Sequence, residues 1–177
     1  MGREIRRVPP NWEHPRAECR HKNPWRLDGC DDAKAHDGMC LQPMFDSDFD
    51  TALYEWVEEY ELWKKGEHPH QKDYPYWEYA GPPPDPAYYH PKWEVEPTWY
   101  QVYETVSEGT PVTPPFATKG ELVDYLVEHG DFWDQRRGDG GWKHENAEQF
   151  VNAGWAPSAW IHVGVTDLMA PRDGFSE

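Results

Sequence analysis

The sequence has no long apolar run and few cysteines. No stretch of its 177 residues approaches the roughly 18 consecutive apolar residues that a membrane-spanning helix needs. The opening residues, MGREIRRVPPNW, also lack the apolar segment of a signal peptide. The three cysteines cannot all pair in disulfides, which suits a reducing compartment. We therefore expect a cytoplasmic protein that makes no contact with a membrane.

Positive charge is scarce. The chain has 17 Lys or Arg against 33 Asp or Glu, a formal net charge of −16. Residues 1–30 hold seven of the basic side chains and only four acidic ones, so residues 31–177 carry a net charge of −19. Such a field repels phosphates, which argues against direct nucleic-acid binding and favours a basic partner. The alternative is that the acidity serves solubility alone.

Aliphatic side chains are few, and aromatic rings take their place. Only 37% of the residues are hydrophobic, yet the chain contains 11 Trp, 10 Tyr and 6 Phe, each of which buries a large area. Residues 1–45 are interrupted by five prolines and predict an irregular N-terminal segment, with at most a brief strand near residues 5–8. Residues 46–177 predict a single domain.

Residues 47–64 predict a helix, with Asp46 or Ser47 as its N-cap and Gly66 as its C-cap. Apolar residues recur on one face at 4-3-4-3 spacing: Phe49, Leu53, Trp56, Tyr60 and Trp63. The helix also has an acidic face, formed by Glu55, Glu58, Glu59 and Glu61. These residues either are simply solvated, or they mimic nucleic-acid phosphates and occupy a basic groove on a host protein. Residues 67–98, rich in proline and aromatic residues, predict an ordered arm rather than a linker, with a helical turn after Pro86.

Two further helices and two strands complete the predicted fold. Residues 99–106 and 159–165 have the β-branched and aromatic composition of strands. Thr118 and Glu121 predict a capping box for a helix that ends at Gly130, and a third helix covers residues 144–153 after a loop at 131–142. We expect an α+β fold in which about three helices pack on one face of a small antiparallel sheet, with long irregular arms.

Several segments have distinctive sequences: WYQVYETVSEGTPVTPPFAT, ELVDYLVEHG, GDFWDQRRGDGGW and AEQFVNAGWAPS within Trp99–Ser158, and REIRRVPPNWEHP and QPMFDSDF nearer the N-terminus. In these segments the chain resembles uncharacterised proteins encoded by tailed bacteriophages and prophages. The resemblance implies a phage or prophage origin, and hence the cytoplasm of an infected bacterial host, but it implies no reaction.

One segment has the ligand types of a zinc site. Sulfur and nitrogen ligands for a structural zinc are supplied by Cys19, His21, Cys30 and Cys40. Their spacing lacks the C-x-x-C pairs of common zinc modules, so the alternative is a loop of reduced cysteines and surface histidines. We therefore expect no cofactor, with a structural zinc on this segment as the alternative. His68 and His70 are expected to be solvent-exposed rather than a second metal pair.

The loop at 131–142 is the first candidate for a binding site. Its candidate residues are Asp131, Trp133, Asp134, Arg136, Arg137 and Trp142. The two carboxylates could act as general acid and base while the arginines hold an anionic substrate. The alternative is an ordered loop in which the arginines pair with acidic groups and the rings anchor it. Residues 107–118 are a weaker candidate for an anion site, because three prolines remove N–H donors ahead of the helix.

No catalytic motif rises above background, so we expect a protein that is not an enzyme. The leading hypothesis is an acidic, phage-encoded accessory protein that binds a host or defence protein with a basic surface, in an anti-defence role. The first alternative is a small enzyme, or a nucleotide- or anion-binding protein, that uses the 131–142 loop. The second alternative is a structural component of the virion.

Overall fold

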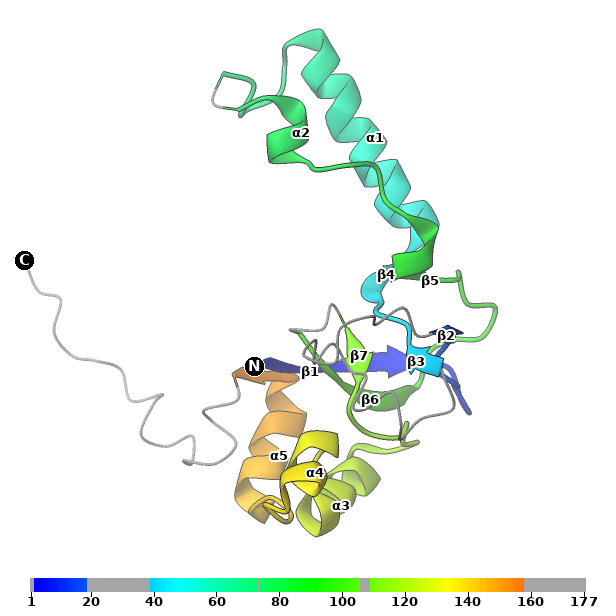
Figure 1. Ribbon diagram of the computed structural model, residues 1–177, viewed down its shortest axis with the longest axis vertical. Coiled ribbons are helices and arrows are strands. Elements are labelled where there is room, and N and C mark those ends of the chain that lie inside the picture. Colours follow the sequence, from blue (N-terminus) through cyan, green and yellow to red (C-terminus); the bar gives the residue numbers. More distant parts are fainter. Residues whose placement is uncertain (1, 19–38, 73, 106–108, 158–177) are drawn as a thin grey trace, which may run out of the picture.

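The computed structural model describes residues 2–18, 39–72, 74–105 and 109–157 and has an α+β fold (Figure 1). Its centre is a four-stranded sheet in the order β7-β6-β1-β8, with antiparallel neighbours. The strands are β1 (Gly2–Val8), β6 (Trp99–Glu104), β7 (Thr110–Pro111) and β8 (Trp155–Pro157). The expected α+β architecture is confirmed, whereas the strand expected at 159–165 lies outside the described residues.

Strand β1 corrects the expectation that residues 1–45 are irregular. It lies in the middle of the sheet, paired with β6 along residues 3–8 and with β8 along residues 2–4. The sequence gives no alternating apolar pattern here because four positions carry charge: Arg3, Glu4, Arg6 and Arg7. Arg3 and Arg6 are nonetheless buried in the fold. The brief strand expected near residues 5–8 is therefore longer, covers residues 2–8 and lies within the sheet.

Two helices, α3 (Lys119–His129) and α5 (His144–Ala153), pack together and supply most of the core at the sheet. Helix α3 begins at the expected capping box, in which Thr118 and Glu121 bond each other's backbone N–H, and α5 has the expected bounds. The fully enclosed residues between the helices and the sheet are Val102, Val112, Leu122, Val123, Leu126, Trp142, Ala147, Phe150, Val151 and Ala156.

The segment expected to be a loop at 131–142 contains a short helix, α4 (Phe132–Arg137). Asp131 caps its first turn by accepting from the backbone N–H groups of Trp133 and Asp134, and Gly138 ends it in the left-handed conformation at φ 72°. A single six-residue helix is too short for apolar periodicity to reveal it, whereas its capping residues were visible in the sequence.

A long projection leaves the body between two short parallel strands, β4 (Phe45–Asp48) and β5 (Tyr89–His90). It consists of α1 (Phe49–Lys65), the turn α2 (Tyr76–Tyr79) and the single-turn helix η1 (Pro86–Tyr88). We call residues 49–88 the arm; it extends away from the sheet in Figure 1. The helical turn expected after Pro86 is confirmed as η1, and α1 is capped by Asp48 rather than by Asp46 or Ser47.

The sheet face opposite the helices is covered by the chain that follows β1. This chain continues into β2 (Arg16–Glu18), which pairs with β3 (Met39–Leu41). Its rings pack over β6, where His14 contacts the ring of Tyr103. Within the described ranges, no helix is both long enough and apolar enough to cross a membrane.

Candidate protein-binding surface

Asp131 and Asp134, the two carboxylates of the 131–142 segment, face inward. They are 1% and 2% exposed. Asp131 accepts from Arg3 Nε at 2.6 Å through one oxygen, and from the N–H groups of Trp133 and Asp134 at 2.7 and 3.0 Å through the other. Asp134 accepts from the N–H of Asp131 at 3.0 Å and from the indole N–H of Trp142 at 2.5 Å. Both carboxylates therefore have several donors within the protein.

The other candidate residues of the segment join or flank this network. Arg137 donates to the second oxygen of Asp134 at 2.6 Å, and the indole N–H of Trp133 donates to Glu104 on β6 at 2.6 Å. Arg136 is exposed on the surface of α4. The structure thus brings five of the six candidate residues into one hydrogen-bonded unit and leaves Arg136 at its edge.

The geometry of this unit suits folding better than acid–base catalysis. A general acid or base must reach a substrate within hydrogen-bond distance, and both carboxylates are enclosed. Asp131 neutralises a buried arginine of β1, and Asp134 holds a core tryptophan and the α4 helix. These contacts support the structural alternative for the 131–142 segment.

Most of the proposed zinc ligands lie outside the described residues, namely Cys19, His21 and Cys30. Cys40 lies in β3 and is half-buried. Within the described part of the chain, no group of three or more His, Cys, Asp or Glu side chains could hold a metal ion. The zinc site stays a prediction from the sequence.

The two weaker site candidates have local structural roles. His68 is only 6% exposed, which corrects the expectation that it faces solvent. Its ring contacts Trp63 and Tyr79, and its Nδ1 accepts from the backbone N–H of His70 at 3.2 Å. In the 107–118 segment, Thr118 is used as the cap of α3, while residues 107 and 108 lie outside the described ranges.

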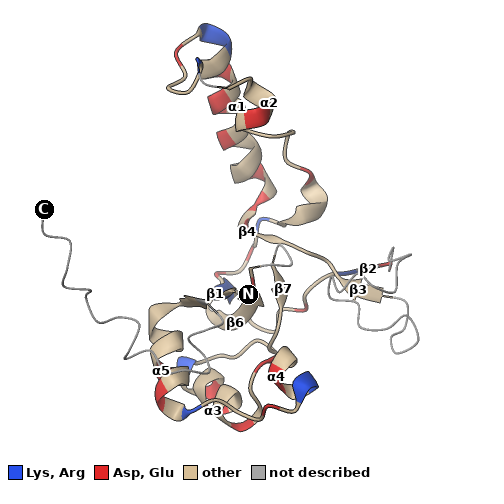
Figure 2. Cartoon of the chain, turned by 60° about the vertical axis from the view of Figure 1, so that its left-hand side comes forward, with Lys and Arg blue, Asp and Glu red and all other residues tan. Residues whose placement is uncertain are grey.

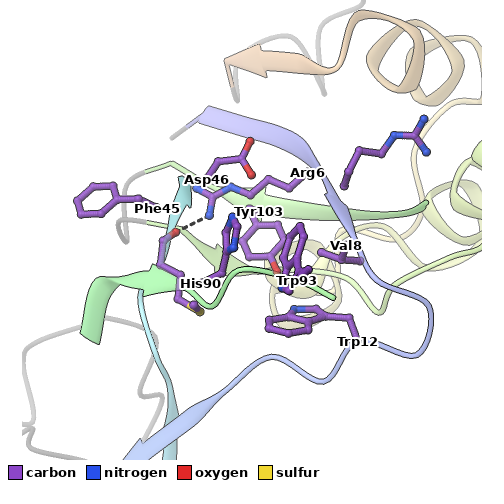
Figure 3. A pocket seen from close by; sticks show the side chains of 10 residues that line it. Arg6, Val8, Trp12, Phe45, Asp46, His90, Trp93 and Tyr103 are labelled. Atoms are coloured by element: carbon purple, nitrogen blue, oxygen red, sulfur yellow. Dashed lines mark hydrogen bonds between the residues drawn. The ribbon is translucent and has the colours of Figure 1, made fainter. Parts of the chain in front are cut away.

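Arg6 connects the body to the base of the arm. Figure 3 shows its side chain reaching from β1 toward the base of the arm, where it donates to the carbonyl of Met44. The guanidinium also lies 4.5 Å from the ring centre of Tyr103 and pairs with Glu4 at 2.5 Å. The adjacent cavity of about 10 Å³ holds roughly one water molecule. The guanidinium therefore occupies the space over the Tyr103 ring, and the cavity left beside it is too small for a ligand larger than water.

His14 fixes the segment that leads into the arm. Its Nε2–H donates to the carbonyl of Gln42 at 2.6 Å, and its Nδ1 lies 3.2 Å from the hydroxyl of Tyr103. That hydroxyl donates to Gln101 at 2.9 Å. Burial lowers the pKa of His14 from its ordinary value, and the hydrogen bond to Gln42 only partly offsets this effect. Burial raises the pKa of Tyr103 to about 12.

A groove of about 330 Å³ lies beside these residues, at the lower end of the roughly 300–1,000 Å³ typical of ligand sites. Rings and prolines line much of it, including Trp12, Pro115 and Phe132. Its polar lining residues Gln101 and His14 already bond other protein atoms. The groove therefore has room and apolar contacts for a small ligand, but Gln101 and His14 already form hydrogen bonds with other protein atoms.

The inner face of the arm is a cluster of aromatic rings around Tyr76. The rings of Trp56, Tyr60 and Trp63 lie 5.5, 5.1 and 5.3 Å from that of Tyr76, which also donates to the Trp56 carbonyl at 3.0 Å. The predicted aromatic face of the helix therefore packs within the arm. This packing is thin, because no residue of α1 is buried and Tyr76 and His68 are the only buried arm residues among those described.

The outer surface of the arm combines carboxylates with exposed rings. Figure 2 shows acidic residues recurring along α1. Residues 49–88 contain nine Asp or Glu and three Lys. Large exposed side chains accompany them: Tyr54, Val57, Leu62, Tyr74, Trp77 and Tyr79, with Trp77 the most open at 73%. An aromatic and acidic projection of this kind is typical of a protein-binding surface.

Comparison with known proteins adds no relative to this picture: no protein-family model, curated protein or solved structure matches the chain.

Sequence reasoning found the acidic residues of α1 but missed the apolar residues between them. The 4-3-4-3 pattern assigns one apolar face to the helix, and Tyr54, Val57 and Leu62 fall off that face. An apolar residue off the core face of an amphipathic helix is a signal that could have marked them. The pairing of Arg3 with Asp131 across 128 positions left no local signal.

Proposed function

We propose that this chain is a phage-encoded accessory protein that acts in the cytoplasm of the infected host by binding a host or defence protein with a basic surface. The observation that carries this function is the arm, which projects from the body, contributes little to the core and exposes carboxylates beside aromatic side chains. A net charge of −16 favours a basic partner, because opposite charge steers association.

The alternative of a small enzyme that uses the 131–142 segment has weaker support. Its two carboxylates are enclosed and hydrogen-bonded to the protein, so a substrate would have to displace contacts that hold α4 to the sheet. Protein binding through the arm requires no such rearrangement, since the surface is already open.

Affinity capture from host lysate tests this function. The full chain is compared with a variant in which a short Gly/Ser linker replaces residues 49–88. A short linker can join the two ends because Asp48 and His90, which flank the replaced segment, are paired. We expect the full chain to retain a basic protein, with retention that weakens as salt rises, and the armless chain to lose it.

A second variant keeps the arm and removes its charge, in case the armless chain does not fold. It changes Glu55, Glu58, Glu59 and Glu61 to the isosteric Gln. The matched control neutralises four exposed carboxyl groups of the body: Asp124, Glu128, Glu145 and Glu148. Equal retention by the arm and body variants, or retention of no basic protein by the full chain, would contradict the proposal.

A further inference from the structure

Helix α1 has a second apolar face that nothing in the described protein covers. Tyr54 and Val57 lie three residues apart, one helical turn, and are 62% and 42% exposed. Neither belongs to the inner aromatic cluster around Tyr76. A helix that uses one face to pack against its own arm and keeps another apolar face in water resembles the recognition helices that enter grooves of partner proteins.

Carboxylates lie within this outer face and along one side of it. Glu58 and Glu61 follow Tyr54 and Val57 by four residues each, so each carboxylate lies one turn beyond an apolar side chain. The hydroxyl of Tyr54 donates to Glu58 at 2.5 Å, which orients the ring along the helix. Glu55 extends the acidic border on the side toward Leu62. The face therefore combines two apolar side chains with a carboxylate between them, Glu61, and two on the Tyr54 side, Glu58 and Glu55.

The charge decides which partner fits this face. A second copy of the chain would bring two arms together, each with nine acidic and three basic residues, and like charges at an interface oppose association. Nucleic acid is repelled for the same reason. A protein with Lys or Arg beside an apolar surface offers both contacts at once.

We infer that the outer face of α1 docks in a groove of a basic protein, with Tyr54 and Val57 against its apolar floor and with Glu55, Glu58 and Glu61 paired with Lys or Arg of that groove. The inference rests on the proposed function and names the surface and the partner chemistry. The helix has 17 residues and is about 25 Å long at 1.5 Å per residue, which sets the length of the groove. Side chains buried at the centre of such an interface contribute most of its affinity.

A designed peptide tests the inference without the natural partner. The probe is a helical peptide of Leu and Lys whose leucines form one stripe between lysines, and its control has the same composition with the stripe scrambled. Binding to the full chain is followed by NMR chemical-shift changes and titration calorimetry. We expect the striped peptide to bind more tightly than the scrambled peptide. Its binding should change the amide chemical shifts of residues 50–62 more than those of the body.

Single substitutions then separate the apolar floor from charge. We expect Val57→Ser and Tyr54→Ser each to weaken binding of the striped peptide about tenfold. Val and Ser have similar helix propensities, so α1 should persist in circular dichroism. Tyr54→Phe keeps the ring and should bind nearly as the unchanged protein does. The matched control is Val95→Ser, which changes a valine that is 58% exposed outside the arm.

The outcomes distinguish this inference from the proposed function. Equal binding of the striped and scrambled peptides, unchanged binding by Val57→Ser and Tyr54→Ser, or shifts centred on Trp77 would overturn the docking face. The arm could still be required for capture of a basic host protein, and the function would then stand through another surface. Loss of arm-dependent capture, with stripe-selective peptide binding intact, would instead refute the proposed function.

Discussion

Replacing Arg3 by Met should destabilise the protein by about 3–5 kcal/mol, the range for removing one partner of a buried ion pair. Arg3 is 3% exposed, and its Nε lies 2.6 Å from Asp131, which is 1% exposed. Met fills a similar volume without charge, so the main consequence is that two enclosed carboxylates, Asp131 and Glu104, lose the charge of Arg3. Asp131 also caps α4, so the loss should spread from β1 to the 131–142 segment.

Urea unfolding, followed by tryptophan fluorescence, measures this loss. With an m value of about 1–3 kcal/mol per molar, the midpoint should fall by at least about 1 M. The matched control is Arg7→Met on the same strand, whose exposed guanidinium donates to the Thr98 carbonyl and lies over the ring of Tyr100. That change should cost about 1 kcal/mol or less. If Arg3→Met and Arg7→Met unfold at the same urea concentration, the buried pair does not hold the fold as described.

Three further predictions concern the base of the arm and the zinc segment. Gly109→Ala should lower the free energy of unfolding by more than about 2 kcal/mol, because φ is +94° and a Cβ would lie 1.9 Å from the Met44 carbonyl oxygen. The control Gly138→Ala, which has no atom near its Cβ, should cost about 1 kcal/mol. Thermal unfolding measures both changes. The pKa of His14 is lowered in the fold, so below pH 6.5 the unfolded chain takes up the proton first and stability should fall with acidification. In His14→Gln this dependence should flatten, and an equally steep profile would refute the assignment. Purified protein should contain about one zinc per chain if the 19–40 segment is a structural site, and less than half an equivalent excludes it.

The elements that were predictable from the sequence are those with local rules. Helix α3 has its capping box, and α5 and β6 have apolar patterns that span a whole element. Each of these signals lies within the segment it describes. A neighbouring strand or helix was not needed to recognise them.

Strand β1 and the role of the 131–142 segment depend on distant partners. Arg3 is compatible with a central strand because the carboxylates of Asp131 and of the cross-strand Glu104 lie beside it in the folded chain. The Asp131 carboxylate therefore looked like a binding or catalytic group as long as its partner was unknown. Buried charge is the case in which local hydropathy misleads, since pairing and not polarity decides whether a side chain can be enclosed.

The arm shows the opposite relation between sequence and structure. The aromatic stripe of α1 correctly predicted a packed face, but the pattern could not indicate that this face would be covered only by a short return segment. The thin packing leaves rings and carboxylates in solvent together. That combination is a property of tertiary structure, and the proposed binding surface rests on it.

The proposed binding of a basic protein depends on the negative charge of the arm. The most direct measurement is the affinity of the captured host protein for the full chain and for the variant with Gln in place of Glu55, Glu58, Glu59 and Glu61, at about 50 mM and about 300 mM salt. We expect the affinity of the full chain to fall strongly with salt, and the variant to bind more weakly with a shallower salt dependence. Identical affinities and salt dependences for the two proteins would contradict this dependence on charge.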